Sequence, residues 1–74
     1  MCHRWGKIMD FETFCLNLSK ERIKKGLSAY ELSLRLGKDP SYINKLENGK
    51  INVSLKTIIE ISECLNVPIT KFFE

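Results

Sequence analysis

The sequence predicts an all-α fold, a compact domain of five short helices. Apolar residues recur three and four positions apart along most of the 74-residue chain, which is the spacing of one helix face. Serine, aspartate and glycine stand where these runs start and end, as they do at helix termini. The alternation of apolar and polar residues that indicates a strand is absent. We therefore expect one domain at residues 10–74, preceded by a disordered N-terminal extension at residues 1–9.

The first predicted helix spans residues 10–25. Asp10 and Glu12 favour its start, because a carboxylate is stabilised near the positive end of the helix dipole. Gly26 favours its end, because glycine enters left-handed backbone conformations at little cost. The inward face of this helix is expected to comprise Phe11, Phe14, Cys15 and Leu18.

The second and third predicted helices, residues 29–36 and 40–48, are short and are joined by a tight turn at Gly37. Ser28 and Glu31 have the spacing of a capping box at the start of the first of them. Their shared core residues are expected to be Leu32, Leu36, Ile43 and Leu46.

The third helix has start and stop signals of its own. Asp39 can cap it, Pro40 suits its first position, and Gly49 can end it in a left-handed conformation. Two helices this short and this closely joined predict a helix-turn-helix at residues 29–48. In this motif the second helix enters the major groove of DNA.

A fourth helix, capped by Ser54, is predicted through about Leu65, and a short fifth helix from about Pro68 to Phe73. The inward face of the fourth helix is expected to comprise Leu55, Ile58, Ile61, Ser62 and Leu65. A dimer interface is not evident. Its candidates are Ile59, Ile69, Phe72 and Phe73, but most of them are expected to close the small core instead.

The positive charge of the chain is concentrated in its middle. Residues 20–50 carry eight basic and four acidic side chains, whereas residues 1–19 are neutral and residues 51–74 have a net charge of −1. The excess therefore coincides with the predicted helix-turn-helix and the helix before it. A polyanionic partner is the natural inference, and a solvated basic face without a partner is the alternative.

Metal binding and catalysis are not expected. Cys2, Cys15 and Cys64 show no metal-ligand spacing, and an odd number of cysteines fits a reducing compartment. His3 is the only histidine, and beside Cys2 alone it would make a poor zinc site. No serine or cysteine has a recognisable base, so we expect no enzyme and no cofactor.

The chain is expected to be cytoplasmic and not to enter a membrane. No apolar run approaches the roughly 20 residues that span a bilayer. The N-terminal residues lack the apolar stretch of a secretory signal.

The segment from Leu27 to Gly49 resembles the helix-turn-helix of the phage repressor/Cro family, also called the XRE family. The apolar core positions and the turn glycine match, the run LENGK at residues 46–50 is close to a family signature, and the resemblance extends over roughly residues 18–73. It implies a five-helix lambda-repressor-like DNA-binding domain. It also implies a sequence-specific regulator of transcription, a repressor that binds double-stranded DNA as a homodimer on a roughly palindromic operator.

Four positions depart from the family pattern. Ala29 replaces a glutamine that often contacts phosphate, Ser33 a small alanine, Lys38 an apolar turn residue, and Val53 a proline. Because Ala29 cannot make the side-chain contact, we expect a single domain to bind DNA weakly and to depend on a dimer.

The resemblance also implies which residues meet DNA. The expected base-reading residues are Ser41, Asn44 and Lys45, and their hydroxyl, amide and ammonium groups suit base edges. The placement of the residues, and not the resemblance, assigns the expected phosphate contacts to Tyr42, Asn48 and Lys50. Lys38 in the turn and the helix N-terminus at Ser28 are further candidates for such contacts. The alternative is a polar helix face that only meets solvent.

Two further features concern structure and partners. The family's matching pair implies an internal salt bridge between Arg22 and Glu47, with a phosphate contact of Arg22 as the alternative. Tyr30 and Leu34 lie four residues apart on the outer side of the second helix, where RNA polymerase or another protein could bind, although single exposed apolar residues are common. An antitoxin or a protein-interaction module with an autoregulatory or vestigial helix-turn-helix is the alternative function.

Overall fold

Residues 11–74, the part of the chain that the computed structural model describes, form four α-helices followed by one 3₁₀ helix. The all-α prediction is confirmed for these residues, but the fifth predicted helix is a short 3₁₀ helix and not an α-helix. Asp10, the N-terminal extension and the Cys2–His3 pair lie outside the described residues. In chain order the elements are α2 (Phe11–Lys24), α3 (Ala29–Arg35), α4 (Tyr42–Glu47), α5 (Leu55–Leu65) and η1 (Ile69–Phe73).

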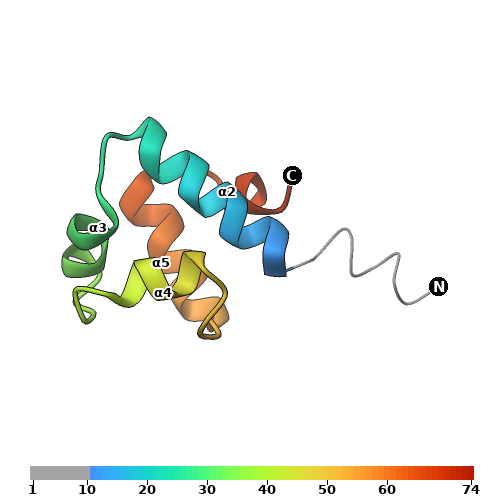
Figure 1. Ribbon diagram of the computed structural model, residues 1–74. Helices are drawn as coiled ribbons and strands as arrows, with labels where there is room; N and C mark the ends of the chain where they lie inside the picture. The colour runs from blue at the N-terminus through green and yellow to red at the C-terminus, as the bar shows by residue number, and fades with distance from the viewer. Residues whose placement is uncertain (1–10) are drawn as a thin grey trace.

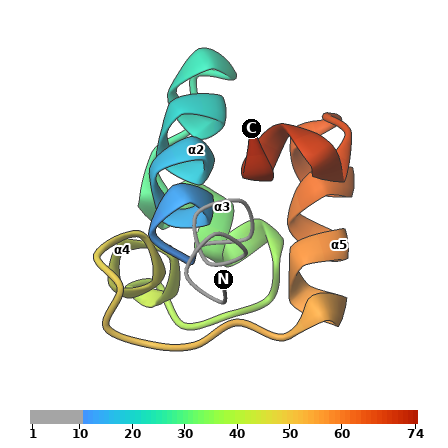
Figure 2. The ribbon, with the colours of Figure 1, turned by 90° about the vertical axis from the view of Figure 1, so that its right-hand side faces the viewer.

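The longest helix of the described residues, α2, packs against α4 and η1, whereas α3 packs mainly on α4 and α5 mainly on η1. In Figure 1, α3 and α4 lie next to each other below α2. Figure 2 shows η1 between α2 and α5, where it contacts both helices. The last turn of the chain therefore closes the domain on the side away from α4.

The core draws side chains from all five elements. The ring of Phe14 packs against two rings of η1. Its centroid lies 5.6 Å from that of Phe72, in an edge-to-face arrangement, and 5.8 Å from that of Phe73, in a stacked arrangement. Burying each large apolar side chain contributes roughly 1.5–3 kcal/mol, so η1 is anchored by its aromatic residues. Phe72 is fully buried and is not available to a dimer, whereas Ile59 is 43% exposed. The buried core comprises Phe14, Cys15, Leu18, Leu32, Ile43, Leu46, Ile61, Leu65 and Phe72.

The predicted inward face of α5 was wrong at its first residue. Leu55 is 67% exposed, and Thr57 is buried in its place. Ser54 caps α5 as predicted, accepting a hydrogen bond from the Thr57 N–H at 3.2 Å. The hydroxyls of Ser54 and Thr57 also lie 3.0 Å apart, so the cap satisfies a buried polar group and lets threonine occupy an apolar face.

Left-handed glycines stop the helices at the predicted places. Gly37 and Gly49 both have a φ of +72°, a conformation in which a side chain would be strained. Their positions fix the short lengths of α3 and α4. None of the helices in residues 11–74 has the length and apolar character needed to cross a membrane.

Candidate nucleic-acid interface

The start of α3 carries the predicted capping box. The Glu31 N–H donates to Ser28 Oγ at 3.0 Å, and the Ser28 N–H donates to Glu31 Oε1 at 3.1 Å. The Ser28 hydroxyl also lies 3.3 Å from Glu31 Oε1. Both polar groups of Ser28 are therefore engaged by a carboxylate, and a phosphate would have to compete with that carboxylate.

Ser33 links α3 to α4 through a buried hydroxyl. Its Oγ donates to the Ala29 carbonyl at 2.8 Å and accepts the Ile43 N–H at 3.0 Å. The first N–H groups of a helix have no partner within it, and Ser41, which precedes α4, makes no side-chain cap. Ser33 therefore satisfies an amide of α4 from the neighbouring helix. The sequence signal for this role was the serine at a position where the family carries alanine, but sequence reasoning did not assign it.

The start of α4 differs from the prediction. The α-helix begins at Tyr42 and not at Pro40, and a tighter turn precedes it, closed by the Tyr42 N–H donating to the Asp39 carbonyl at 2.9 Å. Asp39 does cap this turn, because its Oδ2 accepts the Ser41 N–H at 3.0 Å and the Ser41 hydroxyl. The hydrogen bond from the Ser41 hydroxyl lowers the pKa of the Asp39 carboxyl the most, and the one from the Ser41 N–H lowers it further.

The three predicted base-reading residues share the outer surface of α4 and the turn before it. Asn44 and Lys45 are exposed, and Ser41 is half-buried with its hydroxyl bound to Asp39. Asn44 accepts two hydrogen bonds from Asn48 Nδ2, at its backbone O (2.8 Å) and at its side-chain Oδ1 (3.2 Å). The turn before α4 therefore offers hydrogen-bond acceptors, the oxygens of Asp39 and Ser41. The helix itself offers hydrogen-bond donors, from Asn44 and Lys45.

Apart from Ser28, which caps α3, the predicted phosphate-contacting residues lie at the two ends of α4. Lys38 Nζ is 5.5 Å from the centroid of the Tyr42 ring, so a cation–π contact joins the turn before α4 to the first residue of the helix. Lys50 is exposed just after Gly49. Asn48 is exposed as well, but its amide N–H₂ is directed to Asn44.

Arg22 and Glu47 form the ion pair that the resemblance implied. Arg22 Nε and Nη2 donate to the two Glu47 oxygens at 2.7 and 3.0 Å, and Arg22 Nη1 donates to the Leu27 carbonyl at 2.8 Å. The side chains are only 14% and 12% exposed. The Glu47 hydrogen bond raises the pKa of Arg22, against the opposing effect of burial. All three guanidinium nitrogens are thus engaged inside the protein, which argues against the alternative phosphate contact of Arg22.

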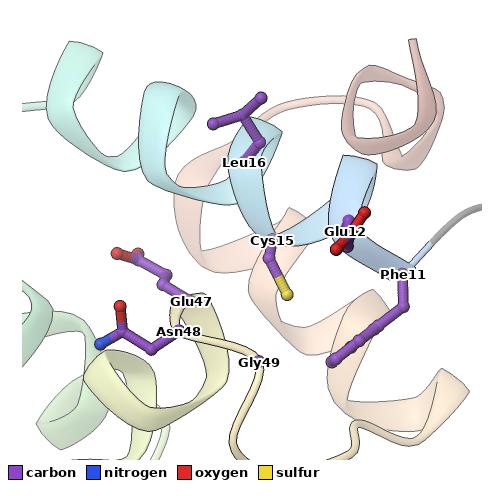
Figure 3. A pocket seen from close by; sticks show the side chains of 7 residues that line it. All are labelled: Phe11, Glu12, Cys15, Leu16, Glu47, Asn48 and Gly49. Atoms are coloured by element: carbon purple, nitrogen blue, oxygen red, sulfur yellow. The ribbon is translucent and has the colours of Figure 1, made fainter.

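Cys15 adds a second link between α2 and α4. Its thiol donates to the Leu46 carbonyl at 3.0 Å, and Figure 3 shows its sulfur pointing toward the end of α4. This contact is beside an open pocket lined by Phe11, Glu12, Cys15, Leu16, Glu47, Asn48 and Gly49. In the same view the Asn48 side chain points away from Phe11 and Cys15. Residues 11–74 contain no cluster of three or more potential metal ligands.

The predicted partner residues on α3 are open to solvent. Tyr30 is 59% exposed and Leu34 is 50% exposed, and both lie away from the buried Leu32. Neither side chain contributes to the core, so they remain available for a contact.

Known proteins match this chain in sequence and in structure. The family described as Helix-turn-helix (HTH_3) matches residues 18–72. The hypothetical transcription factor NHTF from Neisseria is similar in structure with a TM-score of 0.81 and 25% identity, covering 86% of this chain and 74% of that one. The restriction-modification controller protein C.AhdI from Aeromonas hydrophila has a TM-score of 0.79 and 34% identity, covering 86% and 97%. The search of curated proteins gave no match.

The sequence match covers the capped α3, the glycine turn and α4, which are the elements that the internal bonds hold together. The chain therefore belongs to the helix-turn-helix family of the XRE type, a family of DNA-binding transcriptional regulators.

Proposed function

We propose that this transcriptional regulator is a repressor that reads a specific operator with α4 in the major groove. The observation that carries the proposal is the division of α4 into two faces. Ile43 and Leu46 are fully buried, whereas Asn44 and Lys45 are exposed on the opposite side. A short polar helix held by its inner face is the element that this fold inserts into DNA.

Base recognition is assigned to Ser41, Asn44 and Lys45. Lys45 can donate to guanine O6 and N7, and Asn44 can place an amide against a base edge. The Ser41 hydroxyl donates to Asp39, so toward a base it acts as an acceptor and favours the amino groups of adenine or cytosine.

Phosphate contacts are assigned to the two flanks of α4. Lys38 and Tyr42 form the first, and Lys50 forms the second. Contacts of this kind set the register of the helix on the duplex without reading sequence. The Ser28 region is a weaker candidate, because Glu31 occupies its hydrogen-bonding groups.

A homodimer accounts for how so small a reading surface could select an operator. Two copies would place their α4 helices one turn of DNA apart, about 34 Å, on a roughly palindromic site. A dimer bound to a site that overlaps a promoter excludes RNA polymerase from it, and this is the mode of repression that we propose.

The test is selection from a randomised duplex pool at several salt concentrations, followed by sequencing of the bound fraction. We expect a palindromic motif, with an affinity that falls steeply with salt because phosphate contacts release counterions. The variant Asn44→Ala/Lys45→Ala should retain salt-dependent binding and lose the motif. A wild-type pool without enrichment would rule out sequence-specific recognition, and a reporter gene that is activated would rule out the repressor.

A contact with RNA polymerase or another protein is a second role, favoured by the exposure of Tyr30 and Leu34. The variant Tyr30→Ala/Leu34→Ala separates the two roles, because neither side chain lies on α4. We expect normal DNA binding with altered regulation in the reporter. Normal regulation by this variant would remove the partner role, and with it the antitoxin or protein-interaction alternative at this surface.

A further inference from the structure

We propose that Asn48 determines specificity by holding the amide of Asn44 in one orientation toward DNA. Asn48 Nδ2 donates to the Asn44 backbone O at 2.8 Å and to Asn44 Oδ1 at 3.2 Å. Both residues are exposed: Asn44 lies on the outer surface of α4, and Asn48 is the C-cap residue four positions later. The inference rests on the proposed function, because it concerns the base that α4 reads.

The orientation matters because an asparagine amide is chemically two-sided. Its oxygen accepts and its N–H₂ group donates, and a free asparagine can turn either atom toward a base. In this protein Asn44 Oδ1 is engaged by Asn48, and the Asn44 N–H₂ group has no partner within residues 11–74. Asn44 therefore meets the groove as a donor.

A fixed donor selects among the four bases. Guanine presents the two acceptors N7 and O6 in the major groove, and thymine presents O4. Adenine presents one acceptor, N7, beside its N6 amino donor, and cytosine presents its N4 amino group. Adenine is best read by an asparagine whose oxygen and nitrogen face the base together, and the Asn44 amide would have to turn from the orientation that Asn48 sets to make this paired contact. Asn44 thus favours guanine or thymine, rejects cytosine, and binds adenine less well because only one hydrogen bond to N7 is available.

This role replaces the phosphate contact that the sequence predicted for Asn48. A phosphate oxygen needs a donor, but the Asn48 N–H₂ group already serves Asn44. The remaining polar atom, Asn48 Oδ1, is an acceptor and cannot bind phosphate.

The experiment compares motifs selected by the wild type, Asn44→Ala and Asn48→Ala. The position read by Asn44 is the one whose preference disappears in Asn44→Ala. We expect guanine or thymine there in the wild type. In Asn48→Ala the freed amide can meet adenine with both atoms, so the preference should shift to adenine or relax by about fivefold or more.

Two measurements separate this result from a general loss of binding. Lys50→Ala removes an expected phosphate contact at the same end of α4, and it should weaken binding to all sequences and leave the motif unchanged. Thermal unfolding of Asn48→Ala checks the fold, and amide exchange in the free wild type should show Asn48 Nδ2 protected relative to Asn44 Nδ2.

The possible results decide between the claims. An unchanged motif in Asn48→Ala with uniformly weaker binding would return Asn48 to a phosphate role and overturn the inference alone. Adenine at the Asn44 position in the wild type would also overturn it. A wild-type pool without any motif would overturn both the base-reading function and this inference.

Discussion

Hydrogen bonds hold both faces of α4, but they differ in how far apart in the chain the bonded residues are. On the inner face, bonds from Arg22, Cys15 and Ser33 join residues 25, 31 and 10 positions apart in the chain. On the outer face, the Asp39–Ser41 and Asn44–Asn48 bonds join residues two and four positions apart. The long-range bonds fix where the helix lies, and the local bonds fix which polar atoms it presents.

This difference implies that the two faces can be changed separately. Substitutions on the inner face should act on stability and only indirectly on DNA. Substitutions on the outer face should act on DNA binding, because exposed local hydrogen bonds contribute little to the free energy of folding.

The largest effect is expected from Arg22→Ala. The substitution leaves the carboxylate of Glu47, whose side chain is 12% exposed, without its ionic partner. Breaking a buried pair from one side costs about 3–5 kcal/mol, a large part of the stability of so small a domain. Chemical denaturation measures the loss, with Arg22→Lys as the control that keeps the charge without the two-pronged geometry. Unchanged stability with weaker DNA binding would show instead that Arg22 acts at phosphate.

Ser33→Ala should come next, with a loss of about 1–3 kcal/mol. It leaves the buried Ile43 N–H without an acceptor, and an unsatisfied buried donor carries its full desolvation cost. Ser62→Ala is the matched control, because its hydroxyl only donates to the Ile59 carbonyl within α5 and its removal strands no donor. Equal losses in the two variants, measured by thermal unfolding, would contradict the linking role of Ser33.

Lys45→Ala tests the outer face. We expect a loss of about 1–3 kcal/mol in discrimination among operator variants and an unchanged melting temperature. Titration of labelled operator and of single-base variants measures the change. A fall in melting temperature comparable to that of Ser33→Ala would show that the two faces are not separable.

The smallest effect concerns Asp39. Its pKa is lowered in the folded protein, so its contribution to stability is present above the pKa of an unfolded aspartate, about 3.9, and is lost as the pH falls through the folded value. Carboxyl chemical shifts followed by nuclear magnetic resonance should titrate below pH 3.9 in the wild type and return toward it in Ser41→Ala. A midpoint that does not move would mean that the Ser41 hydroxyl does not hold this carboxylate.

Features set within a few residues were predicted well. The capping box at Ser28, the cap at Ser54 and the glycine stops at Gly37 and Gly49 all involve partners at most four positions away. The apolar spacing likewise placed Phe14, Leu18, Leu32, Ile43 and Leu46 in the core. Such signals are readable because neighbours in the chain are neighbours in a helix.

Features that depend on distant partners were predicted poorly or only through the resemblance. The Arg22–Glu47 pair came from the family and not from spacing, and the Cys15–Leu46 contact was not foreseen. Leu55 was placed inside because it is apolar, whereas the packed α5 turns Thr57 inward and satisfies its hydroxyl with Ser54.

The sequence by itself therefore determined the all-α class, the turns of the helix-turn-helix and the polar character of α4. Only the tertiary structure decided that Ser33 satisfies α4 from α3, that Phe72 closes the core, and that Asn48 occupies the oxygen of Asn44. The physical reason is that propensity and capping act over one helical turn. Packing and side-chain hydrogen bonds, in contrast, are settled only when whole helices are placed against each other.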